Sequence, residues 1–87
     1  MVKFRRAECF PPSLFIEEDL EARGKELSWL LKQSGKGNVA VADVMQGKHM
    51  TPRAAVALSR ALGGSTEFWF NLDALWRQWL AYKEARP

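Results

Sequence analysis

Residues suited to recognising nucleic acid are concentrated in the middle of the chain. Asn38 carries an amide that can bond an adenine edge through two hydrogen bonds, and Ala40 and Ala42 carry methyl groups that can contact thymine. Around them lie side chains and a helix start that can hold phosphates. The predicted DNA-binding set is Lys36, Gly37, Asn38, Ala40, Lys48, His49 and Arg53. Two alternatives stay open, since Asn38 is also a common helix cap and His49 also fits an ordinary loop.

The charges of the chain are segregated along the sequence. The net charge is +3, but residues 10–30 are rich in Asp and Glu, whereas residues 31–64 hold five Lys and Arg residues against Asp43 alone. A basic segment of this kind suits phosphate contacts, and it equally suits an ordinary solvated surface. Charge therefore permits nucleic-acid binding without requiring it.

Residues for catalysis or metal binding are few. The chain has one cysteine, Cys9, and one histidine, His49, and it has no Gly-rich phosphate loop. Cys9 cannot form an internal disulfide, and the acidic residues Glu17, Glu18, Asp19 and Glu21 fit a solvated helix face. We therefore expect no enzyme activity, no metal site and no cofactor.

The length of 87 residues and a hydrophobic content of 47% predict a single small domain. We expect a flexible arm at residues 1–9, one domain at residues 10–83 and a tail at residues 84–87. The role of Lys3, Arg5 and Arg6 in the arm stays open. No apolar run approaches the ~20 residues needed to cross a bilayer, and the first residues lack a secretory pattern, so we expect a cytoplasmic protein.

Helical signals cover nearly the whole domain and predict an all-α fold. The clearest are Thr51 as a cap before Pro52, an apolar stripe that ends at Gly63, and Ser65 as the cap of the last helix. Earlier in the chain, Ser13 is expected to cap a helix that ends near Gly24.

Two short helices are expected in the middle of the domain. The first covers Glu26 to Gln33 and is broken by Ser34 and Gly35. The second is capped by either Gly37 or Asn38, buries Val41, Val44 and Met45, and ends at Gln46 and Gly47. Two short helices joined by a tight Gly-containing turn are typical of a helix-turn-helix.

The last helix has more aromatic surface than one buried stripe needs. Three of the four tryptophans of the chain lie in it. We expect Trp69 to complete the core of the domain, and a second copy of the chain to cover the remaining apolar side chains. The predicted dimer interface comprises Trp76, Trp79, Leu80 and Tyr82. A two-fold contact there would place two DNA-reading helices about one DNA turn apart.

Three segments of the chain resemble the XRE-like helix-turn-helix antitoxins of the HigA type. They are EEDLEARG at Glu17 to Gly24, VMQGKHMTP at Val44 to Pro52 and ALGGSTEFWFNLDALW at Ala61 to Trp76, the last being the most distinctive. The resemblance implies a five-helix domain of the lambda-repressor type that dimerises, binds an operator in its own promoter and neutralises a ribonuclease toxin. The implied partners are double-stranded operator DNA, the cognate toxin and a second copy.

The chain departs from that family where DNA should be read. Glu26 and Leu27 stand where the family usually has Ser-Gln, and the segment from Gly37 to Ala40 lacks the usual arginines. Leu31 replaces a small alanine that packs closely on the reading helix. The expected function is an autorepressing antitoxin, and the alternative is a helix-turn-helix protein-interaction or dimerisation module that has lost specific DNA binding.

Overall fold

The regular structure of residues 10–85, which the computed structural model describes, is entirely helical. In chain order the elements are α1 (Pro12–Arg23), α2 (Leu27–Gln33), the 3₁₀ turn η1 (Gly35–Gly37), α3 (Asn38–Met45), α4 (Pro52–Leu62) and α5 (Thr66–Ala85). The prediction of an all-α fold is confirmed for this part of the chain, which contains five α-helices. None of these helices is long and apolar enough to cross a membrane.

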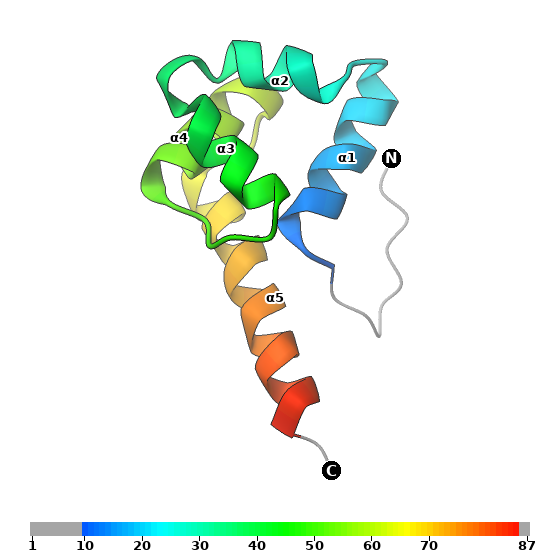
Figure 1. Cartoon of the computed structure of the whole chain (residues 1–87), viewed down its shortest axis with the longest axis vertical. Helices are drawn as coiled ribbons and strands as arrows, with labels where there is room; N and C mark the ends of the chain where they lie inside the picture. The colour runs from blue at the N-terminus through cyan, green and yellow to red at the C-terminus, as the bar shows by residue number, and fades with distance from the viewer. Residues whose placement is uncertain (1–9, 86–87) are drawn as a thin grey trace.

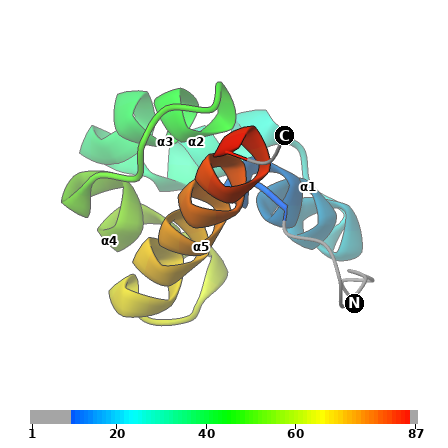
Figure 2. The ribbon, with the colours of Figure 1, turned by 90° about the horizontal axis from the view of Figure 1, so that it is seen from below.

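Helix α4 lies behind α3 in the view of Figure 1 and contacts α2, η1, α3 and α5. Its side toward the core carries small residues, Ala54, Ala55 and Ala57, which let the neighbouring helices approach closely. The first half of α5 packs on α4 and α1, and its second half extends beyond the other helices (Figures 1 and 2). The expected core residue Trp69 is only 1% exposed, so it belongs to the core of the domain itself.

The caps expected at the starts of α4 and α5 are present. The amide of Ala54 donates to Thr51 Oγ1 at 3.2 Å, and the amide of Phe68 donates to Ser65 Oγ at 3.0 Å. Gly63 and Gly64 both have positive φ, as expected for the residues that end α4. Short polar side chains and glycines thus fix where α4 begins and where α5 begins.

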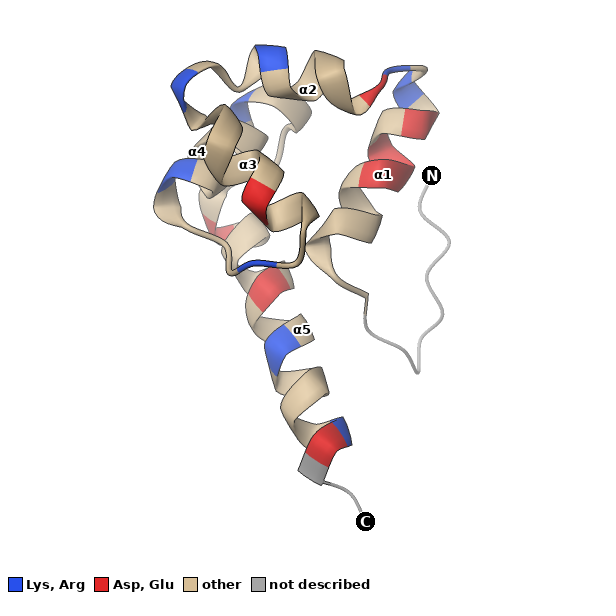
Figure 3. Ribbon diagram, viewed as in Figure 1, with Lys and Arg blue, Asp and Glu red and all other residues tan. Residues whose placement is uncertain are grey.

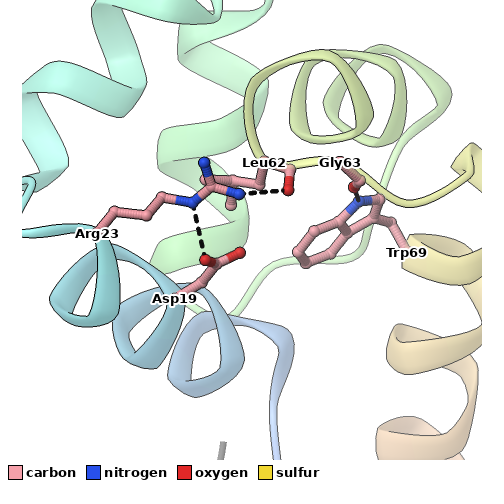
Figure 4. Close-up of polar contacts among 5 residues, drawn as sticks. All are labelled: Asp19, Arg23, Leu62, Gly63 and Trp69. Atoms are coloured by element: carbon pink, nitrogen blue, oxygen red, sulfur yellow. Dashed lines mark hydrogen bonds and ion pairs between the residues drawn. The ribbon is translucent and has the colours of Figure 1, made fainter. Parts of the chain in front are cut away.

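The carbonyl groups at the end of α4 are satisfied by side chains from two other helices (Figure 4). Arg23 Nη2 of α1 donates to the oxygen of Leu62 at 2.7 Å, and Trp69 Nε1 of α5 donates to the oxygen of Gly63 at 3.0 Å. Asp19, one turn before Arg23, holds the guanidinium through Nε at 2.8 Å. These bonds join α1, α4 and α5 at one junction, because unpaired terminal carbonyls of a helix need partners.

The two ends of the helical domain differ from the predicted boundaries. Helix α1 begins at Pro12 with Pro11 as its cap, so the prediction of Ser13 as the cap is wrong and Ser13 lies inside the first turn. The reason is that the fixed φ of proline suits the first helical position and its missing amide costs nothing there. At the other end, α5 continues to Ala85, two residues into the predicted tail. The predicted arm at residues 1–9, with Cys9, lies outside the described residues.

Candidate nucleic-acid interface

The connection between α2 and α3 is a tight turn packed against α4. Ser34 is buried and donates through Oγ to the oxygen of Leu30 at 2.7 Å, while the amide of Gly37 donates to the oxygen of Ser34 at 2.9 Å. A Cβ atom at Gly37 would lie 3.0 Å from Cβ of Ala57. A side chain at this position would therefore push the turn away from α4, and Gly37 allows the close approach.

Helix α3 presents one face to the core and the other to solvent. Val41 and Val44 are buried, and Met45 and Ala40 pack against the core beside them. At 100° per residue, the remaining positions occupy an arc of ~140° on the opposite side. We call this surface the outer face of α3; it comprises exposed Asn38, Val39 and Gln46 and half-buried Ala42, with half-buried Asp43 at its border.

The position of Ala40 corrects one prediction. The sequence predicts that Ala40 contacts a thymine methyl group, but this residue packs against the core and does not belong to the outer face. Val39, one residue earlier, is 69% exposed and lies on the outer face. Gly37 also differs from expectation, because it is buried and its amide is already bonded to Ser34.

Cations gather at the leading end of α3. A groove of about 630 Å³ runs between the α2–α3 turn and the face of α4 that extends from Pro52 to Arg60. Lys36, Arg53 and Arg60 lie along it, and none of the described residues that line it is acidic. Its other lining residues include Gln33, Pro52 and Val56. Figure 3 shows Lys and Arg residues on α2, on the turn and on α4, and others at the end of α1 and on α5, while acidic residues lie on α1, α3 and α5.

The loop after α3 carries the second group of predicted phosphate contacts. Lys48 is exposed and lies with Nζ 3.6 Å from Oδ1 of Asp43. His49 is also exposed, with Nδ1 3.9 Å from Oδ2 of Asp73 in α5. Helix α3 has eight residues and is therefore ~12 Å long. The residues of the groove lie at its start, and Lys48 and His49 follow its end.

Asp73 fixes this loop to α5. It is 8% exposed, and its Oδ2 accepts a hydrogen bond of 3.2 Å from the amide of Met50. Arg77, one turn later in α5, lies with Nε 3.4 Å from Asp73 Oδ1 and donates through Nη2 to the oxygen of Gly47 at 2.7 Å. Two side chains of α5 therefore hold both ends of the segment that carries Lys48 and His49.

The fold leaves five of the seven predicted DNA-binding residues exposed, and these are Lys36, Asn38, Lys48, His49 and Arg53. The capping interpretation of Asn38 fails, because Gly37 is the N-cap of α3 and no side chain makes a capping bond there. The residues missed are Val39, Gln46 and Arg60. A helical projection of Asn38 to Met45 would have identified Val39, since Val41 and Val44 already define the buried side.

The predicted dimer residues lie on the half of α5 that extends beyond the other helices. Trp76, Trp79 and Leu80 are half-buried, and Tyr82 is 55% exposed. The rings of Trp79 and Tyr82 stack with centroids 6.1 Å apart. Leu75, which is absent from the predicted interface, is 56% exposed and lies one helical turn before Trp79. An apolar strip thus remains on α5 outside the core.

Within residues 10–85, no group of three or more His, Cys, Asp or Glu side chains could hold a metal ion. Comparison of the chain with protein-family models, curated proteins and solved structures gave no match.

Proposed function

We propose that this chain is a DNA-binding protein in which α2, η1 and α3 form a helix-turn-helix of the lambda-repressor type. Helix α3 enters the major groove with its outer face toward the bases. The phosphates of the two strands are bound by Lys36 and Arg53 near the start of α3 and by Lys48 after its end.

The observation that carries this proposal is the exposure of Asn38 and Val39 at the leading end of α3, beside a groove lined by cations. The first residues of a reading helix are the ones that reach base edges. The opposite side of α3 is packed on the core, so the orientation of these residues is fixed by the fold. The N-terminal end of α3 also adds the positive end of its helix dipole on the side proposed to face the DNA.

A gel-shift titration against the DNA upstream of the chain's own gene tests this function. We expect a sequence-preferring complex whose affinity falls steeply with salt. Replacing Arg53 by alanine should reduce the magnitude of the salt slope by about 0.9 for each phosphate that the variant no longer neutralises. Lys83 is an exposed cation on α5 and serves as the matched control, since Lys83→Ala should leave the slope unchanged. The absence of any salt-sensitive shift at micromolar protein would refute a working repressor.

We further propose that the DNA-binding protein is the antitoxin of a toxin–antitoxin module, which represses its own operon as a dimer. The sequence resemblance supports the antitoxin role, and the exposed Leu75 and Tyr82 support a partner on α5. Coexpression with the neighbouring small gene product tests the role. Rescue of growth together with copurification supports it, and continued toxicity in the presence of the folded chain refutes it.

One observation favours a second function. The outer face of α3 carries no Lys or Arg, the residues that read guanine most often, and such a face also fits a helix-turn-helix module that serves protein interaction or dimerisation alone. Replacing both Asn38 and Lys48 by alanine discriminates the two functions. A repressor loses operator affinity, whereas an interaction module retains its partner with unchanged affinity and binds no operator before or after the change.

A further inference from the structure

The outer face of α3 has a composition that limits which bases it can recognise. We propose that it reads A·T base pairs, with Val39 packed against the methyl group of a thymine and Asn38 bonded to an adenine. This inference rests on the proposed DNA-binding function and goes beyond it by naming the bases that are read. Two experiments distinguish a failure of the proposed DNA binding from a failure of this inference. The first selects duplexes that the chain binds, and the second removes single thymine methyl groups from them.

The outer face lacks Lys and Arg, the long cationic donors that most often recognise guanine. Arg and Lys bond the O6 and N7 acceptors of guanine, whereas Asn and Gln bond the N6 and N7 of adenine. Asn38 and Gln46 are the amide side chains on the outer face, at its two ends. Lys36 lines the groove against α4, and Lys48 lies beside Asp43, so both cations are directed to the flanks of α3.

The apolar part of the face provides contacts for thymine methyl groups. Val39 has the largest exposed fraction, 69%, among the exposed large hydrophobic residues of the described chain. Ala42 lies one turn later on the same face, and residues three apart on a helix are neighbours. Both methyl-bearing side chains lie between the amides of Asn38 and Gln46. In the major groove only thymine offers a methyl group, so an apolar patch there selects thymine.

Asp43 lies at the border of the face. Its carboxylate accepts hydrogen bonds and cannot donate, so it repels phosphates and can accept from N6 of adenine as well as from N4 of cytosine. The ammonium group of Lys48 lies 3.6 Å from this carboxylate and offsets its repulsion of the DNA phosphates. Asp43 adds no preference between A·T and G·C pairs, so the proposed discrimination depends on Asn38 and Val39.

The experiment begins with selection of the full chain against randomised duplexes at fixed salt. We expect the selected half-sites to share a core of A·T pairs. Thymines in that core are then replaced one at a time by deoxyuridine, which removes only the methyl group. Burial of one methyl group predicts that binding weakens about fourfold at each contacted position.

The same binding measurements with Val39→Ala test whether Val39 contacts a thymine methyl group. Because Val39 is largely exposed, its replacement should leave the fold intact, which circular dichroism and thermal unfolding check. We expect the variant to bind the thymine duplex several-fold more weakly and to show no further weakening with deoxyuridine at one position. Phe70→Leu is the control, because it changes an exposed apolar side chain of α5 that lies outside the groove and the outer face of α3, and it should retain the fourfold difference.

Each outcome has its own meaning. If no duplex is selected and binding shows no salt dependence, the proposed DNA-binding function is wrong, and this inference with it. If duplexes bind but the selected core contains guanine, or deoxyuridine changes the affinity of the wild-type chain nowhere, the inference is overturned while DNA binding stands. A difference between thymine and deoxyuridine that survives Val39→Ala at every position overturns the role of Val39.

Discussion

Asp73 is the residue whose replacement most directly tests how α5 supports the loop of the candidate interface. Its buried carboxylate accepts the amide of Met50 at 3.2 Å and lies 3.4 Å from Nε of Arg77. That Nε atom is buried and has no hydrogen-bond partner, so the nearby charge of Asp73 is what offsets its burial. Asp73→Ala removes both interactions, and it leaves the amide of Met50 without its acceptor and the buried Nε of Arg77 without the nearby negative charge.

The size of the effect follows from these contacts. A buried hydrogen bond to a charged group contributes about 1.5–3 kcal/mol, and we expect Asp73→Ala to lower the free energy of unfolding by about 2–3 kcal/mol. For a domain of this size that change corresponds to a Tm lower by roughly 8–24 °C. His49 adds little, since its side chain is 79% exposed and such pairs contribute about 0–1 kcal/mol. Asp73→Asn, which keeps an acceptor for the amide of Met50, should cost about half as much.

Urea unfolding followed by tryptophan fluorescence measures these differences, and hydrogen exchange at the amides of Lys48 to Met50 localises them. We expect faster exchange at Met50 in Asp73→Ala than in Asp73→Asn. His49→Ala is the matched control, since it removes the exposed partner and leaves the buried bonds intact. If Asp73→Ala were as stable as His49→Ala, the carboxylate would not be what holds the loop to α5.

Three further changes test the helix ends and the turn. Thr51→Ala removes the cap of α4 and should cost about 1 kcal/mol in urea unfolding, whereas Thr51→Ser should cost less than half of that. Trp69→Phe removes the bond to the oxygen of Gly63 but keeps an aromatic ring, so we expect a decrease of about 1–2 kcal/mol, against about 3–5 kcal/mol for Trp69→Ala, from thermal or urea unfolding. Gly37→Ala places a Cβ 3.0 Å from that of Ala57 and should cost about 1–3 kcal/mol, and an unchanged stability would show that the turn can move away from α4.

The helix order was predictable because its signals are local. Thr51 with Pro52, Gly63 with Gly64, and Ser65 each act on neighbouring amides or on their own backbone angles, and all three act as expected. The error at Ser13 has the same local origin, since two signals compete there and the proline that precedes it forms the first turn.

The candidate site was predictable only in part, because side-chain exposure depends on packing between distant segments. Ala40 and Val39 are adjacent and both apolar, and contacts with α4 and α1 decide that Ala40 turns inward. The support of the loop by Asp73 joins residues 23 positions apart, and no local signal marks this acid as different from a solvated one. The sequence predicts Gly37 as a possible cap of the second short helix and as part of the DNA-binding set. Its close approach to Ala57 depends on how α4 packs, which no local signal shows.

Two of the three segments that carry the family resemblance meet at the end of α4, whereas the third, Val44 to Pro52, includes Gln46 and Lys48 of the candidate interface. Arg23 belongs to one resembling segment and Leu62, Gly63 and Trp69 to another, and their side chains and carbonyls meet at the junction of α1, α4 and α5 (Figure 4). These residues are required to close the end of α4, whatever the protein binds. The outer face of α3 has its own composition and can differ without disturbing that junction. The resemblance in these two segments therefore bears on how the helices are joined, and the bases that we propose for this chain have to be argued from Asn38, Val39 and their neighbours.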